Sequence, residues 1–412
     1  MKNLPQDFIH LMTQHHGNDV AESLCNALLN TEPEVSVRLN MRKIEAHEAL
    51  RDQFNHALPH LGQPIAWCPN AYYLSQRPTF TFDPLLHAGV YYVQEASSMY
   101  VAHLLHSYGP TTPCAALDLC AAPGGKSTLL AGLIPEGSFL ISNEPMPKRA
   151  HVLAENMQKW TRMSVGQYPV TSMVSNNYPA DFGAFTDCFD VLVTDVPCSG
   201  EGMFRKDEQA IADWSLDNVM MCVERQRSIL QDIWHTLKTG GLLIYSTCTF
   251  NRFEDEDNVR WICSTLGAKL LEERHFFPGR DRGEGFYCAA LRKVDTPDVD
   301  IIQTNDSEDF STLSSTILRK AQRTLRILPQ AFECEGPLVD LTYDDALSYL
   351  RRETIRVDAP KGQLTLTYMG IPLGPGKGVG NRINNQYPEP WRIRTTYTKK
   401  WSLLDISLNE TM

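Results

Sequence analysis

The sequence lacks the cysteine pairs that mark zinc ribbons and redox centres. It has 11 cysteines, an odd number, and no two of them stand in a C-x-x-C arrangement. An odd count without that spacing argues against a disulfide framework and against a zinc ribbon. A reducing compartment is the simplest setting for such a chain, so we expect a cytoplasmic protein that holds no metal.

Long apolar runs are missing as well. No run of the sequence approaches the length that crosses a bilayer, so we expect no membrane association. The first ten residues, M-K-N-L-P-Q-D-F-I-H, lack the apolar centre of a signal peptide. A chain of 412 residues with an ordinary composition is long enough for two or three globular domains. We expect it to work as a monomer.

Positive charge is scarce in the chain as a whole. There are 38 Lys and Arg against 49 Asp and Glu, a net charge of -11, which counts against a uniformly basic nucleic-acid binder. The charge is unevenly spread, however. Residues 295–309 hold six acids and no Lys or Arg, which indicates a solvated linker, whereas residues 361–412 hold seven Lys and Arg against three acids.

One stretch, residues 116–128, organises the rest of the chain and reads A-L-D-L-C-A-A-P-G-G-K-S-T. Residues 116–120 predict a buried strand, residues 121–125 a turn, and residues 126–134 a helix. Sheets of α/β proteins bind nucleotide-like ligands at such a turn, because glycines let the backbone approach the ligand and the helix N-terminus offers unpaired N–H groups. A P-loop of a nucleotide hydrolase would need glycine where Cys120 stands, and the G-x-G-x-x-G pattern is absent.

Strand and helix signals alternate after this stretch. Repeated βα units predict a doubly wound, mostly parallel sheet, so we expect an α/β fold. The first 85 residues mix helical and strand signals and predict a small α+β domain. The expected strands of the sheet are residues 138–143, 169–175, 189–194 and 242–245, with two more near 269–273 and 285–293, and the expected helices include residues 147–160 and 223–237.

Polar groups stand where the expected strands end. Glu144 follows the second strand, 20 residues after Gly124, at the spacing of a ribose-binding carboxylate. Cys198 in P-C-S-G and Cys248 in S-T-C-T each follow a later strand, with Asp195 just before the first of them. If those two strands are neighbours, both cysteines open at the carboxyl edge of the sheet beside the glycine turn, where a thiolate can act as a nucleophile.

The stretch at residues 116–128 resembles the first motif of Sun-type RNA (cytosine-5) methyltransferases, D-x-C-A-A-P-G-G-K-[ST]. Residues 89–100, G-V-Y-Y-V-Q-E-A-S-S-M-Y, resemble the Y-x-Q-E-x-S segment of that family, which also has the two cysteine motifs. The glycine-rich, basic tail at residues 361–394 resembles the small PUA-like domain of bacterial RsmF-type rRNA enzymes. The resemblance covers residues 85–295 and the tail, and extends only vaguely over the first 85 residues.

The resemblance implies a Rossmann-like class I methyltransferase, with S-adenosylmethionine as the methyl donor and a cytosine of rRNA, 16S rRNA foremost, as the acceptor. It implies that Cys248 attacks carbon 6 of the base and that Cys198 assists product release. Asp195 is expected to hold the pyrimidine edge or the donor, and Lys126 to orient the base or to lower the pKa of the thiolate. The donor site implied in this way comprises Ala121, Ala122, Pro123, Gly124, Gly125, Lys126, Ser127, Glu144, Arg149, Asn177 and Asp195.

The sequence departs from the family at the expected adenine contact, where an acidic residue is usual. Asn176 and Asn177 stand there instead, and an amide oxygen can still accept from an exocyclic amine. Arg205 and Lys206 follow the P-C motif, and we expect them to contact RNA phosphates.

These assignments divide the chain into four parts. They are a small RNA-binding-like domain at residues 1–85, a methyltransferase domain at 86–294, an acidic linker at 295–310, and a helical segment with a PUA-like RNA-binding domain at 311–412. The expected partner is RNA, either naked or within the small ribosomal subunit. Two other functions remain open, a tRNA cytosine-5 methyltransferase and a catalytically silent RNA-binding assembly factor. The intact Cys198 and Cys248 argue against the second.

Overall fold

The computed structural model describes residues 3–163, 166–294, 310–395, 400–405 and 408. Contacts divide the chain into two compact units, neither of which is a continuous segment. The domain expected at residues 1–85 is therefore divided between the units, and the linker expected at 295–310 lies outside the described residues apart from Phe310. Unit 1 comprises Met1–Glu34, Glu95–Leu153 and Pro169–Leu328, and unit 2 comprises Val35–Gln94, Ala154–Tyr168 and Pro329–Met412.

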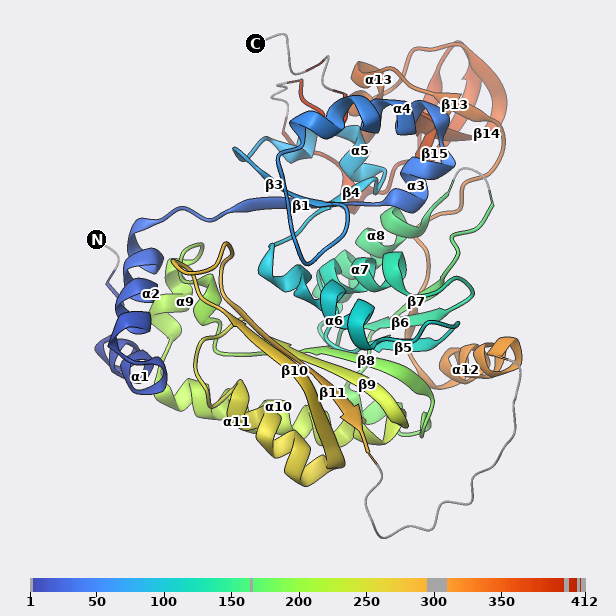
Figure 1. Cartoon of the computed structure of the whole chain (residues 1–412). Helices are drawn as coiled ribbons and strands as arrows, with labels where there is room; N and C mark the ends of the chain where they lie inside the picture. The colour runs from blue at the N-terminus through green and yellow to red at the C-terminus, as the bar shows by residue number, and fades with distance from the viewer. Residues whose placement is uncertain (1–2, 164–165, 295–309, 396–399, 406–407, 409–412) are drawn as a thin grey trace. The chain divides into compact units, whose positions relative to one another are not determined.

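Unit 1 is built on an eight-stranded sheet in the order β10-β11-β9-β8-β5-β6-β7-β12 (Figure 1). The five strands from β9 to β7 are parallel, whereas β11 and β10 on one side and β12 on the other pair antiparallel. The doubly wound, mostly parallel sheet expected from the sequence is confirmed. Its strands are β5 (Ala115–Asp118), β6 (Phe139–Asn143), β7 (Thr171–Ser175), β8 (Phe189–Asp195), β9 (Leu237–Thr247), β10 (Ala268–Phe276), β11 (Phe286–Lys293) and β12 (Ile327–Leu328).

Helices cover both faces of this sheet. The helices α6 (Val101–Tyr108) and α7 (Gly125–Leu133) lie on one face, and α10 (Leu216–Ile233) and α11 (Glu256–Trp261) lie on the other (Figure 1). Coverage on both faces explains why the central strands are apolar throughout rather than alternating. Among the described residues, no helix combines the length and the apolar character needed to span a bilayer.

The main core of unit 1 lies on the α10 side of the sheet. Leu117 of β5, Leu192 of β8 and Leu243 of β9 are fully buried in one cluster with Leu230 of α10. Burying one such side chain contributes about 1.5–3 kcal/mol, so this cluster is a major source of stability. The remaining helices near the sheet are α8 (Pro147–Thr161), which continues from unit 1 into unit 2, α9 (Glu208–Asp213) and α12 (Phe310–Thr324).

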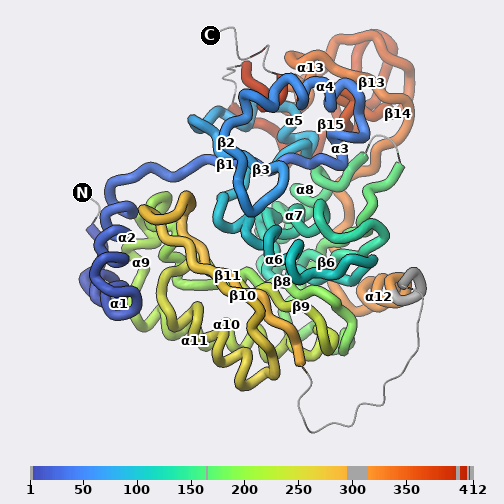
Figure 2. Tube along the Cα trace, in the orientation of Figure 1, coloured from blue at the N-terminus to red at the C-terminus, as the bar shows by residue number. Residues whose placement is uncertain are grey.

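The first two helices belong to unit 1. Helices α1 (Gln6–His16) and α2 (Asn18–Asn30) lie beside α9 (Figure 2). Phe8 of α1 is fully buried and meets Trp214 edge to face, with ring centroids 5.5 Å apart. Phe250, which follows β9, joins the same cluster, so these helices pack against the segments that carry the two cysteine motifs.

Unit 2 contains two small sheets that share one hydrophobic core. The strand orders are β2-β3-β1-β4 and β13-β14-β15-β16. Tyr91 of the first sheet and Leu366 of the second are buried in one cluster, so neither sheet covers its apolar face alone. The elements are β1 (Val35–Leu39), α3 (Met41–Ala46), α4 (Glu48–Ala57), β2 (Gln63–Pro64), β3 (Ala71–Leu74), α5 (Pro84–His87), β4 (Tyr91–Val93), β13 (Leu338–Asp340), α13 (Tyr343–Leu350), β14 (Ala359–Tyr368), β15 (Ile371–Gly380) and β16 (Ile383–Asn385).

Buried donors fasten the end of α8 to the loop before β4 within unit 2. The Nζ atom of Lys43 donates to the carbonyl oxygens of Ala88 and Lys159, both at 2.6 Å, and Asn40 donates to the carbonyl oxygen of Gly89 at 3.1 Å. Burial lowers the pKa of Lys43 well below its ordinary value. Gly89 has a φ of +67°, and a Cβ atom there would lie 2.1 Å from the Lys159 carbonyl oxygen, so the close approach requires glycine.

We predict that Gly89→Ala destabilises unit 2 more than Gly166→Ala does. Gly166 has a similar φ of +72° but open space around it, so both variants carry the left-handed strain of about 1–2 kcal/mol. Only Gly89→Ala also clashes with backbone, which adds roughly 1–3 kcal/mol. Denaturant titrations of the two variants measure the difference, and equal losses of unfolding free energy would contradict the close approach.

Candidate active site

The carboxyl edge of the sheet in unit 1 brings the two cysteine motifs together. The strands β8 and β9 are parallel neighbours, with Asp195 opposite Ser246, as the sequence analysis required. The loops that follow place the Sγ atom of Cys198 3.2 Å from the Sγ atom of Cys248. Both side chains are partly exposed. Two thiols in contact at this edge are a suitable start for a nucleophilic site.

The two thiols have different surroundings. The hydrogen bond with Cys248 raises the pKa of Cys198 well above its ordinary value, and burial and the negative charge of Glu254 act in the same direction. Cys198 therefore keeps its proton at neutral pH. A thiol that keeps its proton is a weaker nucleophile than a thiolate.

Lys126 and Asp195 form an ion pair at the same edge. The Nζ atom of Lys126 lies 2.9 Å from Oδ2 of Asp195, and Oδ1 of Asp195 accepts from the hydroxyl of Ser246 at 2.8 Å. Burial opposes the charge of Lys126, but Asp195, Asp118 and Cys248 outweigh it and raise the pKa of Lys126 above its ordinary value. Lys126 is thus a fixed cation at neutral pH, held in place by Asp195.

The glycine turn between β5 and α7 is tight and well tied. Gly124 has a left-handed φ of 118° before Gly125 opens α7, and Pro123 beside it is exposed. The N–H of Ala121 donates to the Asn143 carbonyl at 2.8 Å. The turn is therefore anchored to the neighbouring strand β6.

Glu144 and Arg149 flank this turn. The Glu144 side chain is only 2% exposed; its Oε1 accepts from the Met146 N–H at 3.0 Å, and its Oε2 lies 3.5 Å from Arg149. Arg149 also donates to the Ala122 carbonyl at 2.8 Å. The structure thus places the expected ribose-binding carboxylate next to the expected glycine turn.

Asn177 lies in the loop after β7, and its side chain is engaged at both ends. Its Oδ1 accepts from the Arg326 N–H at 2.9 Å, and its Nδ2 donates to Asp181 at 3.2 Å. Asn176 donates to the Glu144 carbonyl at 2.8 Å and so orders the backbone around Glu144. The adenine contact expected of Asn177 stays a prediction, made with an amide that already has partners.

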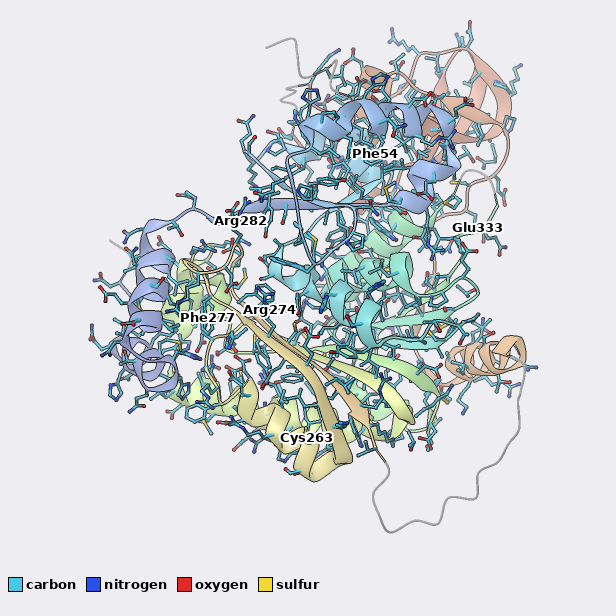
Figure 3. The ribbon with its side chains drawn as sticks, viewed as in Figure 1. Phe54, Cys263, Arg274, Phe277, Arg282 and Glu333 are labelled. Atoms are coloured by element: carbon cyan, nitrogen blue, oxygen red, sulfur yellow. The ribbon has the colours of Figure 1, made fainter. Side chains whose placement is uncertain are left out.

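The phosphate contact expected of Arg205 is wrong. Its side chain is 5% exposed and pairs with Glu284 at 3.1 Å, so it cannot reach a phosphate. Lys206 is more exposed but also lies 3.5 Å from Glu284. Arg282, labelled in Figure 3, is also more exposed than Arg205, and it lies 3.0 Å from Glu34. The ion pairs of Arg205 and Arg282 join segments of unit 1 that are distant in the sequence.

Asp118 is a site residue that the sequence analysis did not select. It is fully buried at the end of β5, where Oδ2 accepts from the Ser127 hydroxyl at 2.6 Å and Oδ1 has no hydrogen-bonding partner. Burial raises the pKa of Asp118 to about 7. Ser142 of β6 and Thr194 of β8 each have a buried hydroxyl without a partner as well. The sequence signal that could have identified Asp118 is a carboxylate within an otherwise apolar strand.

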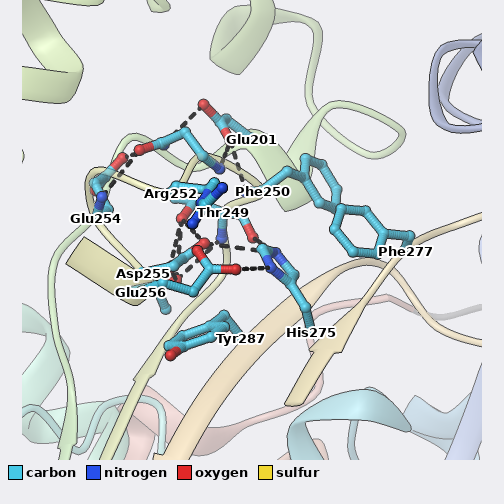
Figure 4. A network of polar contacts seen from close by, with 12 residues as sticks. Glu201, Thr249, Phe250, Arg252, Glu254, Asp255, Glu256, His275, Phe277 and Tyr287 are labelled. Atoms are coloured by element: carbon cyan, nitrogen blue, oxygen red, sulfur yellow. Dashed lines mark hydrogen bonds and ion pairs between the residues drawn. The ribbon is translucent and has the colours of Figure 1, made fainter. Parts of the chain in front are cut away.

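A second cluster of polar side chains in unit 1 follows the Cys248 motif and includes a residue of β10. Asp255, Glu256 and His275 bring potential ligand atoms within 4.8 Å of one another, an arrangement that could hold a metal ion (Figure 4). Asp255 already accepts from the hydroxyls of Thr247 and Thr249. The expectation that the protein holds no metal stays a prediction.

Comparisons with known proteins identify relatives of this chain. Three family models match: 16S rRNA methyltransferase RsmB/F at residues 109–292, the N-terminal domain of 16S rRNA methyltransferase RsmF at 4–96, and the methyltransferase RsmF PUA domain at 337–393. Two curated relatives are named ribosomal RNA small subunit methyltransferase F. The protein of Cronobacter sakazakii is 32% identical over 71% of this chain and 63% of its own length, and that of Shewanella sp. (strain W3-18-1) is 27% identical over 94% and 96%.

Solved structures share the fold. NSun6 from Pyrococcus horikoshii has a TM-score of 0.59 at 16% identity, over 72% of this chain and all of that chain. A methyltransferase homologue from Pyrococcus horikoshii has a TM-score of 0.57 at 23% identity, over 69% and 94%. With models of one family matching its N-terminal, central and C-terminal parts, the chain belongs to the RsmF family of 16S rRNA methyltransferases.

Proposed function

We propose that this protein transfers a methyl group from S-adenosylmethionine to carbon 5 of a cytosine in 16S rRNA, with Cys248 as the nucleophile. The observation that carries the proposal is the pair of thiols 3.2 Å apart beside the Lys126–Asp195 ion pair. Membership of the family supports rRNA methylation, and the thiols support covalent chemistry on a pyrimidine ring.

The chemistry explains the need for a thiolate. Carbon 5 of cytosine is a poor nucleophile until a sulfur adds to carbon 6 and pushes the double-bond electrons toward carbon 5. The bound donor supplies an electrophilic methyl group on a sulfonium sulfur. Carbon 5 takes the methyl group, a base removes the C5 proton, and the bond between sulfur and carbon 6 breaks to restore the ring double bond and the thiolate.

Each of the residues around the two thiols has a role in these reaction steps. Cys248 attacks, and the cation of Lys126 favours its thiolate. Asp195, fixed by Lys126 and Ser246, accepts hydrogen bonds from the N4 edge of the pyrimidine. Cys198 holds a proton in contact with the attacking sulfur and so assists the release step.

The residues at the glycine turn fit a donor that carries hydroxyls and an amino group. The unpartnered buried oxygens of Asp118, Ser142 and Thr194 at this edge are acceptors that a bound ligand can satisfy. Glu144 is poised to accept from ribose hydroxyls. NSun6 from Pyrococcus horikoshii, which shares the fold, was solved with SFG, an analogue of S-adenosylmethionine. The other residues proposed to line the donor are Ala121, Ala122, Pro123, Gly124, Gly125, Lys126, Ser127, Arg149, Asn177 and Asp195.

The C-terminal sheet of unit 2 offers an RNA contact that suits the matched PUA domain. Lys361, Lys377 and Arg382 on β14, β15 and the turn after it are exposed. Because Leu364 and Leu366 of β14 are buried in the core shared with the first sheet, deleting the tail would test folding rather than RNA binding. A tRNA methyltransferase and a catalytically silent assembly factor lack a comparable supporting observation.

A methyl-transfer assay tests the proposed function. We expect purified protein and labelled S-adenosylmethionine to place label in 16S rRNA as 5-methylcytidine, at a position that bisulfite sequencing maps. Naked rRNA, small subunits and tRNA are offered in parallel, so that the preferred substrate emerges from one experiment. Label found only in tRNA, or in any nucleoside other than 5-methylcytidine, would refute the proposal.

The two cysteines should fail in different ways when replaced. Cys248→Ala should abolish both methyl transfer and any covalent protein–RNA adduct, because only the attacking sulfur forms the bond to carbon 6. Cys198→Ala should still attack and methylate but release slowly, so an adduct that survives denaturation should accumulate on gels. The reverse pattern would exchange the two roles, and activity retained in both variants without an adduct would end covalent catalysis as an explanation.

Asp118 should make the stability of the protein depend on pH. Its pKa is raised from 3.8 to about 7 when folded, so its favourable contribution is full below pH 4 and is lost as the pH rises through 7. At 1.36 kcal/mol per pKa unit the loss is at most ~4 kcal/mol. Asp118→Asn keeps an acceptor for Ser127 and should remove this slope. Unfolding free energies of both proteins at pH 4.5 and 7.5 give the difference, and parallel slopes would contradict the buried carboxyl.

A further inference from the structure

Two buried glutamates connect the loops that carry Cys198 and Cys248. We propose that Glu201 and Glu254 form a reciprocal clasp that holds the two thiols in contact, and that they serve the reaction as positioning residues. The effect on methyl transfer rests on the proposed function, whereas the geometry of the thiol pair does not.

Glu254 lies beyond the Cys248 motif and holds the Cys198 loop. Its carboxylate accepts from the Ser199 N–H at 3.1 Å and from the Ser199 hydroxyl. Gln226 donates to it at 2.7 Å, and the same Gln226 amide donates to the Pro197 carbonyl at 3.0 Å. Ser199 and Pro197 are the two chain neighbours of Cys198, so Glu254 and Gln226 together fix that cysteine from both sides.

Glu201 lies beyond the Cys198 motif and holds the Cys248 loop in return. Its Oε2 accepts from the N–H groups of Phe250 at 2.6 Å and Asn251 at 3.1 Å (Figure 4). Its Oε1 accepts from the indole N–H of Trp214 at 2.9 Å. The Gly202 N–H adds a direct bond to the Cys248 carbonyl at 2.8 Å.

One side chain joins the two halves of the clasp. The Nδ2 atom of Asn251 lies 2.8 Å from Glu254 and 3.0 Å from Glu201, and donates to both. Each glutamate thereby collects four donor contacts, which matches the four lone-pair sites of an ionised carboxylate. An amide in either place would turn an NH₂ group toward a donor, so carboxylates are needed here.

The clasp keeps two carboxyl groups buried where a stability argument alone would not. Both glutamates are fully buried, and no Lys, Arg or His among the described residues forms an ion pair with either. Burial and the neighbouring Glu254 raise the pKa of Glu201 to about 7. The charge of Glu254 in turn helps Cys198 to keep its proton. The arrangement separates the roles of the two sulfurs as well as fixing their distance.

The test measures the thiol pair directly with phenylarsine oxide, whose arsenic binds two neighbouring thiols with loss of its oxygen as water. Wild-type protein should bind it at Cys198 and Cys248, as located by peptide mapping, and Cys198→Ala should not bind it there. Glu201→Gln and Glu254→Gln should lower this affinity about tenfold or more, since misplacement by roughly 1 Å can cost on the order of 10²-fold in a positioned reaction. In the same variants kcat should fall about 10- to 100-fold while the KM for the donor stays within about twofold.

Asp83→Asn is the matched control. Asp83 is a fully buried carboxylate in unit 2 that accepts from Leu85 N–H, Tyr91 hydroxyl and Leu403 N–H at 3.0, 3.0 and 2.8 Å. It undergoes the same change from acid to amide, so it reports the cost of losing a buried carboxylate away from the cysteine loops. Its affinity for phenylarsine oxide should equal that of the wild type.

The outcomes separate the clasp from the proposed function. Folded Glu201→Gln and Glu254→Gln proteins with wild-type affinity for phenylarsine oxide would overturn the clasp, and so would a wild-type protein that does not bind it at this pair. If either glutamate variant fails to melt cooperatively, Ser199→Ala replaces it and should weaken binding by a smaller factor that Ser199→Thr restores. If Ser199→Ala binds as the wild type does, the clasp is refuted. A wild type that binds the arsenical but methylates no cytosine refutes the proposed function alone.

Discussion

The parallel pairing of β8 with β9 is the contact on which the candidate site depends. Because Asp195 lies opposite Ser246, both strands end at one level, and the cysteines that follow emerge on the same side. The strand β5 pairs with β8, and the glycine turn after β5 leads into α7, whose Lys126 lies next to Asp195. A slip by one residue would turn Asp195 to the opposite face of the sheet, so the register of this strand pair determines the site.

The buried carboxyl groups of unit 1 lower the stability of the free protein, as is common at binding sites. Asp118, Glu201 and Glu254 are fully buried, and burial raises the pKa of each carboxyl. The positive charge of Lys126 offsets part of the effect of burial on Asp118, and Lys126 itself forms an ion pair with Asp195. Buried charge of one sign lowers the stability of the free protein. Such local costs are typical of places where a protein binds or reacts.

The positions of the strands along the chain and the mostly parallel sheet could be predicted from the sequence, because both depend on local patterns. The sequence placed Cys198 and Cys248 at one edge only on the condition that the two strands before them are neighbours, and the order of the strands came from the structure. Contacts between distant segments could not be read in this way. The sequence around Arg205 does not identify Glu284 as its partner, so the phosphate contact expected of Arg205 was wrong. In the same way, the sequence around Phe8 does not identify Trp214, against which Phe8 packs. The hydrogen bond from the Arg326 N–H to Asn177 is another contact between distant segments.

The shared core of unit 2 has a consequence for how the chain matures during synthesis. Residues Val35–Gln94 leave the ribosome early, yet Tyr91 is covered by partners such as Leu366 that are made much later. At about 5–20 residues per second the wait is on the order of ten seconds or more. Throughout that interval the early segment is an incomplete half with its apolar face uncovered. The apolar face of this early segment therefore stays uncovered until the last strands are made, whereas unit 1, most of whose residues come between the two parts of unit 2 in the sequence, can complete its sheet first.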